Sequence, residues 1–225
     1  MEKHRLPALP RPAGTPCRQL RTPHSALPKL RLGFDIAASG QGDLAVIYID
    51  EAKGDELSMR ALFTCRTEDW DFIKTVLFYF LDNLRNLQAA GDETGLGRQI
   101  CWEAAKHYSG RFLKVNFSAK KSDLGFALMN QLASAEKRFP RSEQDIASDY
   151  LALRKVHNGN KWTFTEGRNL HNPASHCDIA WAGALATHAH TQRKHEVGAA
   201  VLLENGMVMY SDGTMKVLPH PDFPT

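Results

Sequence analysis

The sequence of 225 residues predicts a mixed α/β fold, in which three antiparallel strands are followed by alternating helices and strands. Glycine-containing turns at 40–43 and 53–55 separate three β-rich runs, which is typical of an antiparallel meander. Apolar residues then recur at helical spacing over 68–82, and helical and extended patterns alternate from there. Together these observations predict a mixed sheet flanked by helices.

The first half of the chain supplies most of the expected sheet. Its three opening strands are expected at 30–39, 44–51 and 56–66. The amphipathic helix at 68–82 leads to a weakly β-like strand at 84–91, and the glycines of GDETGLG allow a tight turn into a helix at 96–108.

The second half is expected to be mainly helical. A strand at 111–118 precedes a helix at 121–138, which Pro140 ends. The remaining expected elements are a helix at 143–155, a strand at 161–166, a helix at 176–191 and a hairpin around Asn205-Gly206.

The charge of the chain is uneven and indicates three regions. Residues 1–29 hold six of the eleven prolines and no hydrophobic period, so we expect a disordered basic tail. A single folded domain is expected at 30–192, and a C-terminal extension at 193–225. Residues 1–32 have a net charge of +6, so the rest is −3. A nucleic-acid enzyme of this composition would need a local basic groove rather than a basic surface.

Cysteine spacing and hydropathy indicate a cytoplasmic protein. The four cysteines form no CxxC pair, which argues against a zinc site or a disulfide framework and favours a reducing compartment. We find no apolar run long enough to span a membrane and no signal peptide.

Three aspartates stand where carboxylates are uncommon. Asp35 interrupts an apolar strand, Asp92 ends the fourth strand, and Asp178 lies in the first turn of an apolar helix. Each has a structural explanation as a strand-end acid, a turn or cap residue, or a partner of the helix dipole. As a set, they can converge at one end of a mixed sheet.

Converging carboxylates suit hard divalent cations such as Mg²⁺ or Mn²⁺. Two such ions about 4 Å apart can activate water and stabilise the leaving oxygen of a phosphodiester. The three acids should repel one another without the ions. The sequence therefore predicts a two-metal site at Asp35, Asp92 and Asp178.

Four segments resemble the nuclease domain of phage large terminase subunits, and most of all that of the Mu-like prophage type. They are GFDIAASGQGDLAVIYID, GDETGLG, KVNFSAKK and HCDIAWAGALA, within about residues 30–190. The resemblance implies a ribonuclease H-like fold and an endonuclease that cuts concatemeric viral DNA during packaging. It assigns metal binding to Asp35, Asp92 and Asp178, and Asp43 matches an acid often found near such sites.

The resemblance also implies residues that contact double-stranded DNA. Lys120 and Lys121 match a basic position after the fifth strand, although an exposed helix start explains them equally well. Arg168, His171 and His176 precede the last helix and could contact phosphate, or could be surface residues. The chain has no P-loop motif, so we expect a nuclease domain without its ATPase motor. A separate motor, a small terminase subunit or a portal are the partners implied, in the cytoplasm of a bacterial host.

Two alternatives stay open at this point. Other ribonuclease H-like nucleases, such as Holliday junction resolvases, also use clustered acids. A non-catalytic DNA-binding or packaging-assembly module from a prophage remnant would keep the fold without cutting, and would bind phosphates in a salt-dependent way.

Overall fold

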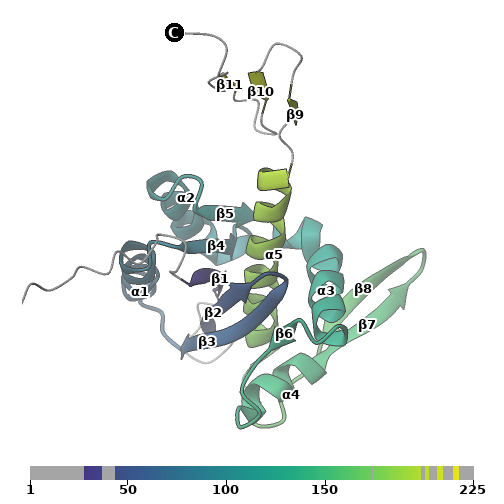
Figure 1. Ribbon diagram of the computed structural model, residues 1–225. Coiled ribbons are helices and arrows are strands. Elements are labelled where there is room, and N and C mark those ends of the chain that lie inside the picture. Colours follow the sequence, from purple (N-terminus) through teal and green to yellow (C-terminus); the bar gives the residue numbers. More distant parts are fainter. Residues whose placement is uncertain are drawn as a thin grey trace, which may run out of the picture.

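The computed structural model describes residues 28–36, 44–173, 175–198, 201–202, 207–209 and 215–217. Most of the basic tail and the expected turn at 40–43 lie outside the described residues. In the remainder, a six-stranded sheet carries helices on both faces (Figure 1).

Three antiparallel strands form one side of the sheet, as the sequence predicts. β1 (Lys29–Asp35) pairs with β2 (Ala45–Lys53), and β2 pairs with β3 (Glu56–Cys65). Gly54 has a φ of 62°, which permits the tight turn between β2 and β3. The meander is therefore confirmed over its described residues.

Parallel strands extend this meander into a mixed sheet. β4 (Leu87–Asp92) runs parallel to β1, and β5 (Phe112–Val115) runs parallel to β4. The short β6 (Lys137–Arg138) lies parallel to β3. The strand order is β5-β4-β1-β2-β3-β6, so the predicted mixed sheet is confirmed.

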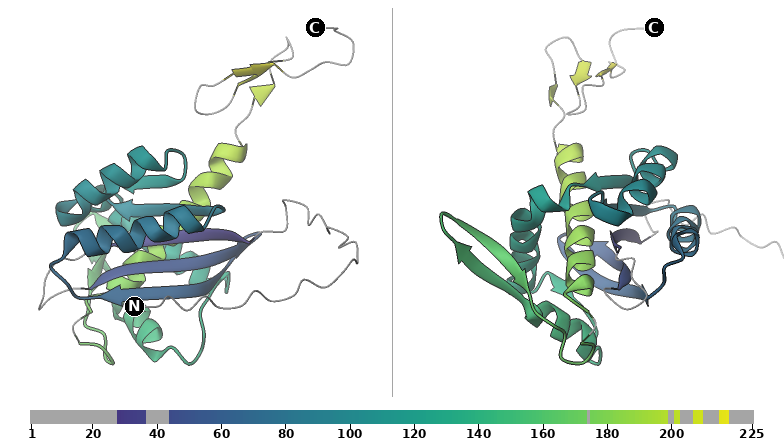
Figure 2. Two further views of the ribbon diagram at one scale, coloured as in Figure 1. Left: turned by 90° about the vertical axis from the view of Figure 1, so that its left-hand side faces the viewer. Right: turned by 180° about the vertical axis from the view of Figure 1, so that it is seen from behind.

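Helices cover both faces of the sheet (Figure 2). α1 (Trp70–Asn83) and α2 (Arg98–His107) pack on one face. α3 (Phe117–Ala133) and α5 (Asp178–Gly198) share a core with the other face, and α4 (Gln144–Ala152) packs against α5. In the described part of the chain, none of these helices has the length and apolar character needed to cross a bilayer.

A second hairpin stands apart from the main sheet. β7 (Leu153–Asn158) and β8 (Lys161–Glu166) pair with each other and project from the body beside α3 (Figure 1). After α5 come three short antiparallel strands: β9 (Val201–Leu202), β10 (Met207–Met209) and β11 (Met215–Val217). The pairing of β9 with β10 fits the expected terminal hairpin, whose turn lies outside the described residues.

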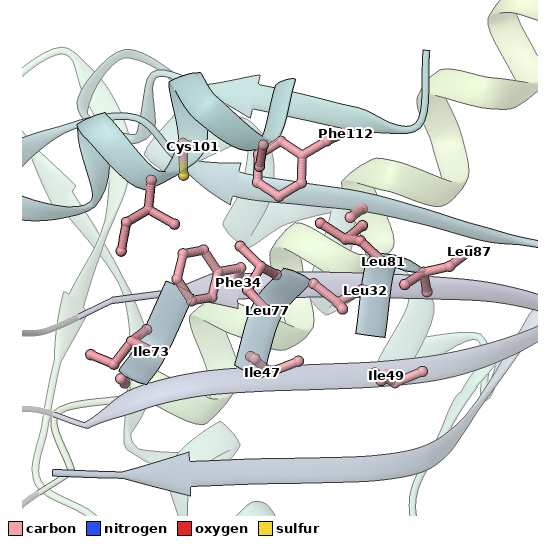
Figure 3. Close-up of a cluster of buried hydrophobic side chains, with 14 residues drawn as sticks. Leu32, Phe34, Ile47, Ile49, Ile73, Leu77, Leu81, Leu87, Cys101 and Phe112 are labelled. Atoms are coloured by element: carbon pink, nitrogen blue, oxygen red, sulfur yellow. The ribbon is translucent and has the colours of Figure 1, made fainter. Parts of the chain in front are cut away.

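The alternation of β1 separates the two cores. Leu32 and Phe34 point towards α1 and α2 and are fully buried there (Figure 3). By the alternation of the strand, Gly33 and Asp35 face the opposite side, where α5 lies. The cluster on the α1 side includes Ile47, Ile49, Ile73, Leu77, Leu81, Leu87 and Phe112. Complete burial of one such side chain stabilises a fold by about 1.5–3 kcal/mol.

The other face of β1 lets α5 lie directly on the strand. A Cβ atom at Gly33 would overlap the carbonyl oxygen of Ala182 and come within 2.6 Å of Ala186 N. Small residues on the helix permit the same close approach, since Ala182 and Ala186 are completely buried. This contact fixes the helix that carries Asp178 over the strand that carries Asp35.

The expected helix at 121–138 was placed too late in the chain. Asn116 caps α3 by accepting from Ala119 N at 3.1 Å, so the helix begins at Phe117 and shortens the strand before it. It ends at Ala133, because Ala135 takes a φ of 56° and the chain turns into β6. Pro140 therefore lies beyond the helix end rather than causing it.

Two further boundaries differ from expectation. The helix expected at 143–155 ends at Ala152, and its last residues form β7, the strand that pairs with β8. α5 continues to Gly198 instead of ending at 191.

A buried histidine on α5 gives the fold an acid sensitivity. Burial, followed by the positive charges of Arg31 and Lys137, lowers the pKa of His190 to about 4 from an ordinary 6.5. Between about pH 6.5 and about pH 4, the histidine is protonated in the unfolded chain but neutral in the folded chain. The free energy of unfolding therefore falls as the pH drops. We expect a loss on the order of 1–2 kcal/mol between about pH 7 and about pH 5 from this group. Denaturant unfolding of His190→Gln at both pH values should show a smaller loss, and an equal loss would contradict this.

Candidate functional site

Asp35 and Asp92 end two neighbouring parallel strands. The β1–β4 register pairs Phe34 with Gly91, so the next residues, Asp35 and Asp92, lie side by side at one edge of the sheet. Ala90, two residues before Asp92, belongs to the core that includes α5. Both aspartates therefore project towards the α5 face.

Asp178 is brought to the same edge by the start of α5. Its Oδ2 accepts from Leu44 N at 2.9 Å and from His176 N at 3.3 Å. Leu44 directly precedes β2, whose first residues pair with the end of β1. Cys177, just before the helix, has a φ of 67°, an uncommon conformation for a residue with a side chain. This sharp turn directs the helix, and with it Asp178, onto the sheet edge.

The three aspartates and Glu166 form an electrostatically strained group, which we call the acidic corner. Burial raises the pKa of Asp35 well above its ordinary value, and the charges of Asp178, Asp92 and Glu166 raise it further. Burial also raises the pKa of Asp92, although the amide and hydroxyl of Thr94 donate to its carboxylate at 2.7–2.8 Å and oppose the shift. Asp35 is thus destabilised in its charged form by carboxylates around it.

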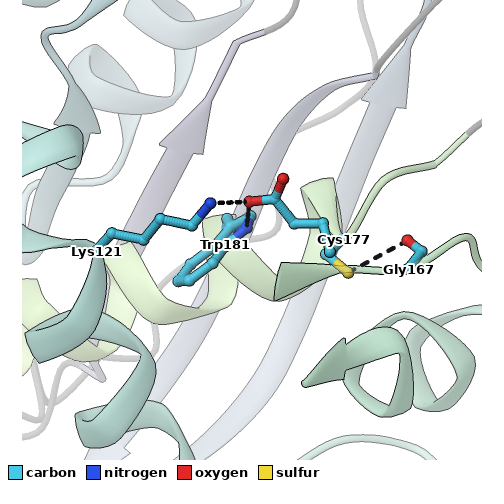
Figure 4. A network of polar contacts seen from close by, with 5 residues as sticks. Lys121, Gly167, Cys177 and Trp181 are labelled. Atoms are coloured by element: carbon cyan, nitrogen blue, oxygen red, sulfur yellow. Dashed lines mark hydrogen bonds and ion pairs between the residues drawn. The ribbon is translucent and has the colours of Figure 1, made fainter. Parts of the chain in front are cut away.

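Glu166 is the member of this group that sequence reasoning missed. It ends β8, and its Oε1 accepts from Lys121 Nζ at 2.6 Å and from Trp181 Nε1 at 2.8 Å (Figure 4). The available signal was its place at the end of a strand, the same feature that singled out Asp92. Its relation to the site depended on β7, which the sequence did not indicate.

The predicted basic residues divide into one at the acidic corner and several away from it. Lys121 reaches Glu166, whereas Lys120 is half exposed and lies 3.8 Å from Asp123 on its own helix. Arg168 donates to the carbonyl of Pro173 at 3.0 Å within its own exposed loop. His171 is exposed in the same loop.

The last two predicted site residues are His176 and Asp43. His176 lies two residues before Asp178 and contacts it through its backbone amide, as described above. Asp43 lies outside the described residues.

The buried thiol beside Asp178 is not suited to nucleophilic chemistry. Burial raises the pKa of Cys177 to about 12, so the thiol stays protonated at neutral pH. Its Sγ lies 3.6 Å from the carbonyl oxygen of Gly167. Cys177 is therefore a packing residue.

The acidic corner fits a hard divalent cation in charge and donor type. Its side-chain donors are carboxylate oxygens, which Mg²⁺ and Mn²⁺ prefer. The repulsion that raises the pKa of Asp35 is the interaction that a cation would relieve. Over the described ranges, however, no three Asp, Glu, His or Cys side chains stand together closely enough to hold an ion. The carboxylates converge on one edge without closing around one point.

Comparisons with known proteins give fold neighbours only. No model of a protein family matches the sequence, and no curated protein matches it. Among solved structures, the large terminase nuclease of thermophilic phage G20c superposes with a TM-score of 0.56 at 16% identity, over 71% of this chain and 81% of that one. The same nuclease with bound magnesium gives 0.56 at 15% identity, over 71% and 80%. The nuclease domain of the Thermus phage P74-26 large terminase gives 0.52 at 16%, over 70% and 77%.

These neighbours establish the fold class. The chain has the ribonuclease H-like mixed sheet of phage large terminase nuclease domains, as the sequence resemblance implied. The acidic corner lies where the ends of β1 and β4 and the start of α5 meet in this fold.

Proposed function

We propose that the protein is a metal-dependent endonuclease that hydrolyses DNA phosphodiester bonds. The observation that carries the proposal is the meeting of Asp35, Asp92 and Asp178 at one edge of a sheet of this fold. Fold neighbours described as large terminase nucleases, one of them solved with magnesium, support a nuclease that binds a divalent cation.

Asp35, Asp92 and Asp178 would hold two ions, Mg²⁺ or Mn²⁺. When bound, such a pair supplies an activated water and stabilises the leaving oxygen in an in-line displacement. The chain's own contribution is to hold the carboxylates in place: Leu44 N fixes Asp178, and Thr94 fixes Asp92. Asp43 is proposed as a further acid of this site. No side-chain nucleophile is required.

The biological role that we propose is cutting of concatemeric phage DNA during packaging. Double-stranded DNA is the proposed substrate, and Lys120, Lys121, Arg168 and His176 are its proposed contacts. A separate terminase motor, a small terminase subunit or a portal would present the DNA, in the cytoplasm of the bacterial host. The domain division at residues 29 and 192 is part of the same proposal.

Cleavage of supercoiled plasmid tests this function directly. We expect nicked and linear products with Mn²⁺ or Mg²⁺, none with EDTA, and at least a roughly 100-fold slower reaction for Asp92→Ala and Asp178→Ala. Circular dichroism would establish that each variant is folded. Absence of cutting by folded wild type in both metals, with and without a motor protein, would favour the non-catalytic DNA-binding module. Preferential cutting of four-way junctions would favour a resolvase.

A further inference from the structure

Three separate elements meet at the carboxylate of Glu166. The acid ends β8, and the two donors to its Oε1 come from α3, through Lys121, and from α5, through Trp181 (Figure 4). The lysine and glutamate side chains are 28% and 34% exposed, so the pair lies at the surface rather than inside the core. Trp181 is buried and holds its indole N–H in a fixed direction. The carboxylate of Glu166 is therefore held by a fixed indole N–H and also accepts from the lysine.

The ammonium group of Lys121 is held more firmly than that of an ordinary surface lysine. Besides Glu166, the rings of Trp181 and Phe117 lie beside it, with centroids 5.4 and 5.9 Å from Nζ. An ammonium has three N–H donors, and Glu166 accepts from it through one oxygen. Within the described residues, the group thus has a fixed position and keeps N–H donors that can bind an anionic oxygen.

This fixed ammonium lies beside the acidic corner. Trp181 follows Asp178 by one helical turn, and the charge of Glu166 acts on Asp35 together with those of Asp92 and Asp178. Because Glu166 contacts Lys121 directly, the ammonium stands at the edge of the group of acids.

We propose that Glu166 is a positioning residue which, with Trp181, holds the Lys121 ammonium where it binds a phosphate of the DNA strand being cut. The proposal rests on the proposed nuclease function and adds a residue to it. A prepositioned cation binds phosphate without the entropy cost of ordering a long side chain. Glu166 therefore acts through Lys121 and not on the DNA itself.

Lys120 provides a matched control for Lys121. It carries the same charge one residue earlier on α3, its side chain is 51% exposed, and its acidic neighbour Asp123 is 3.8 Å away on the same helix. Any effect of total charge on DNA binding should be similar for the two lysines. A difference between them reports the fixed position of Lys121.

Replacement of Glu166 distinguishes positioning from bulk electrostatics, because the two predict opposite changes in the cutting rate. Glu166→Ala removes a negative charge next to DNA, so electrostatics alone predicts binding that is equal or tighter and cutting that is no slower. Positioning predicts that cutting at saturating DNA becomes slower although binding does not weaken. Glu166→Gln keeps an oxygen that can accept from Trp181 and Lys121, so it should recover part of the rate.

The kinetic experiment combines these variants in a double-mutant cycle. DNA affinity is measured by fluorescence anisotropy in EDTA, and the cleavage rate at saturating duplex is measured in Mn²⁺. We expect roughly tenfold slower cutting at saturating duplex for Lys121→Ala and Glu166→Ala, and no further loss in the double variant. Lys120→Ala removes a DNA contact without a fixed position, so it should weaken affinity but slow cutting at saturating duplex clearly less than Lys121→Ala does. The proposal would be overturned if the rate reduction of the double variant equalled the product of the two single reductions. Equal rate reductions for Lys120→Ala and Lys121→Ala would also overturn it.

A spectroscopic arm tests the proposal without any cleavage. In protein labelled with ¹⁵N-tryptophan, the Trp181 Nε1–H resonance is assigned from Trp181→Phe and followed while a short duplex is added in EDTA. We expect it to move in wild type and in Lys120→Ala, and to stay in place in Lys121→Ala. If the chemical shift of this resonance does not change when the duplex is added to wild type, the proposal is overturned. Failure of wild type to cut in either metal would instead count against the nuclease function, and this arm would still decide the positioning.

Discussion

Asp35→Asn is expected to stabilise the metal-free protein while removing its ability to cut DNA. Burial and three neighbouring acids raise the pKa of Asp35, so its charged form weakens the fold at neutral pH. Asparagine has nearly the same shape and no charge. We expect a melting temperature a few degrees higher in EDTA, since roughly 1 kcal/mol moves it by about 2–4 °C in a protein of this size. Plasmid cleavage should fall at least about 10³-fold.

The pH dependence of stability gives the same substitution a second signature. An unfolded aspartate ionises near its ordinary pKa of 3.8, whereas Asp35 in the folded protein keeps its proton to a higher pH. As the pH rises above 3.8, the unfolded state loses its proton first, so the free energy of unfolding falls until the folded carboxyl ionises as well. The wild type should show this fall in EDTA, and Asp35→Asn should lack the part that Asp35 contributes.

Asp123→Asn is the matched control for both measurements. It makes the same chemical change on α3, at a side chain that is 75% exposed. Stability and cutting should both stay close to wild type, because an exposed charge of this kind contributes little. A lower melting temperature for Asp35→Asn in EDTA would show that the carboxylate stabilises the fold and that the acidic corner is not strained.

The acids of the site were visible in the sequence because each one breaks a local pattern. Asp35 interrupts an apolar strand, and Asp92 is the last residue of a strand whose five preceding residues are buried. The β1–β4 register, which the sequence did not indicate, makes these two aspartates neighbours. The mixed sheet was predicted from its glycine-containing turns and from the alternation of helical and extended patterns, whereas its ribonuclease H-like character came from the family resemblance. The last helix was expected from residue 176, two residues before α5 begins at Asp178.

Glu166 could not be placed because the hairpin that carries it has no strong apolar periodicity. β7 reads LRKVHN, with four exposed residues and two partly buried ones, and it follows α4 without a break. A strand that leaves the body of the protein buries little, so burial leaves little mark on its sequence. The relation between Glu166 and Lys121 is tertiary, since 45 residues separate them. Local pattern contains no information about such a contact.

The start of α3 shows a different limit. Asn116 was included in a strand, although its side chain caps the helix that follows and so moves Lys120 and Lys121 into the first turns of that helix. Strand and cap are both compatible with the segment KVNFS, and in the structure Phe117 begins the helix and packs edge-on against Trp181. The sequence therefore indicated Lys120 and Lys121 as candidates, but not that only Lys121 would reach Glu166.

Gly33→Ala is expected to be the most destabilising single substitution near the site. The added Cβ would overlap the carbonyl oxygen of Ala182 and lie within 2.6 Å of Ala186 N, and both are backbone atoms of α5. Side chains can rotate away from a clash, but the backbone of a long buried helix cannot. The helix would have to lift from β1, and we expect a loss of at least about 4 kcal/mol. Urea unfolding of the purified variant measures it.

The same displacement should reach the acidic corner. Asp178 is the first residue of α5, and its bond to Leu44 N ties the helix to the sheet edge that Gly33 supports. Gly54→Ala is the control. Gly54 has a positive φ of 62°, but a Cβ there would meet nothing within 4 Å, so the cost should stay near 1–2 kcal/mol. Wild-type stability in Gly33→Ala would mean that α5 does not rest on β1, and the convergence of Asp35 with Asp178 would lose its structural basis.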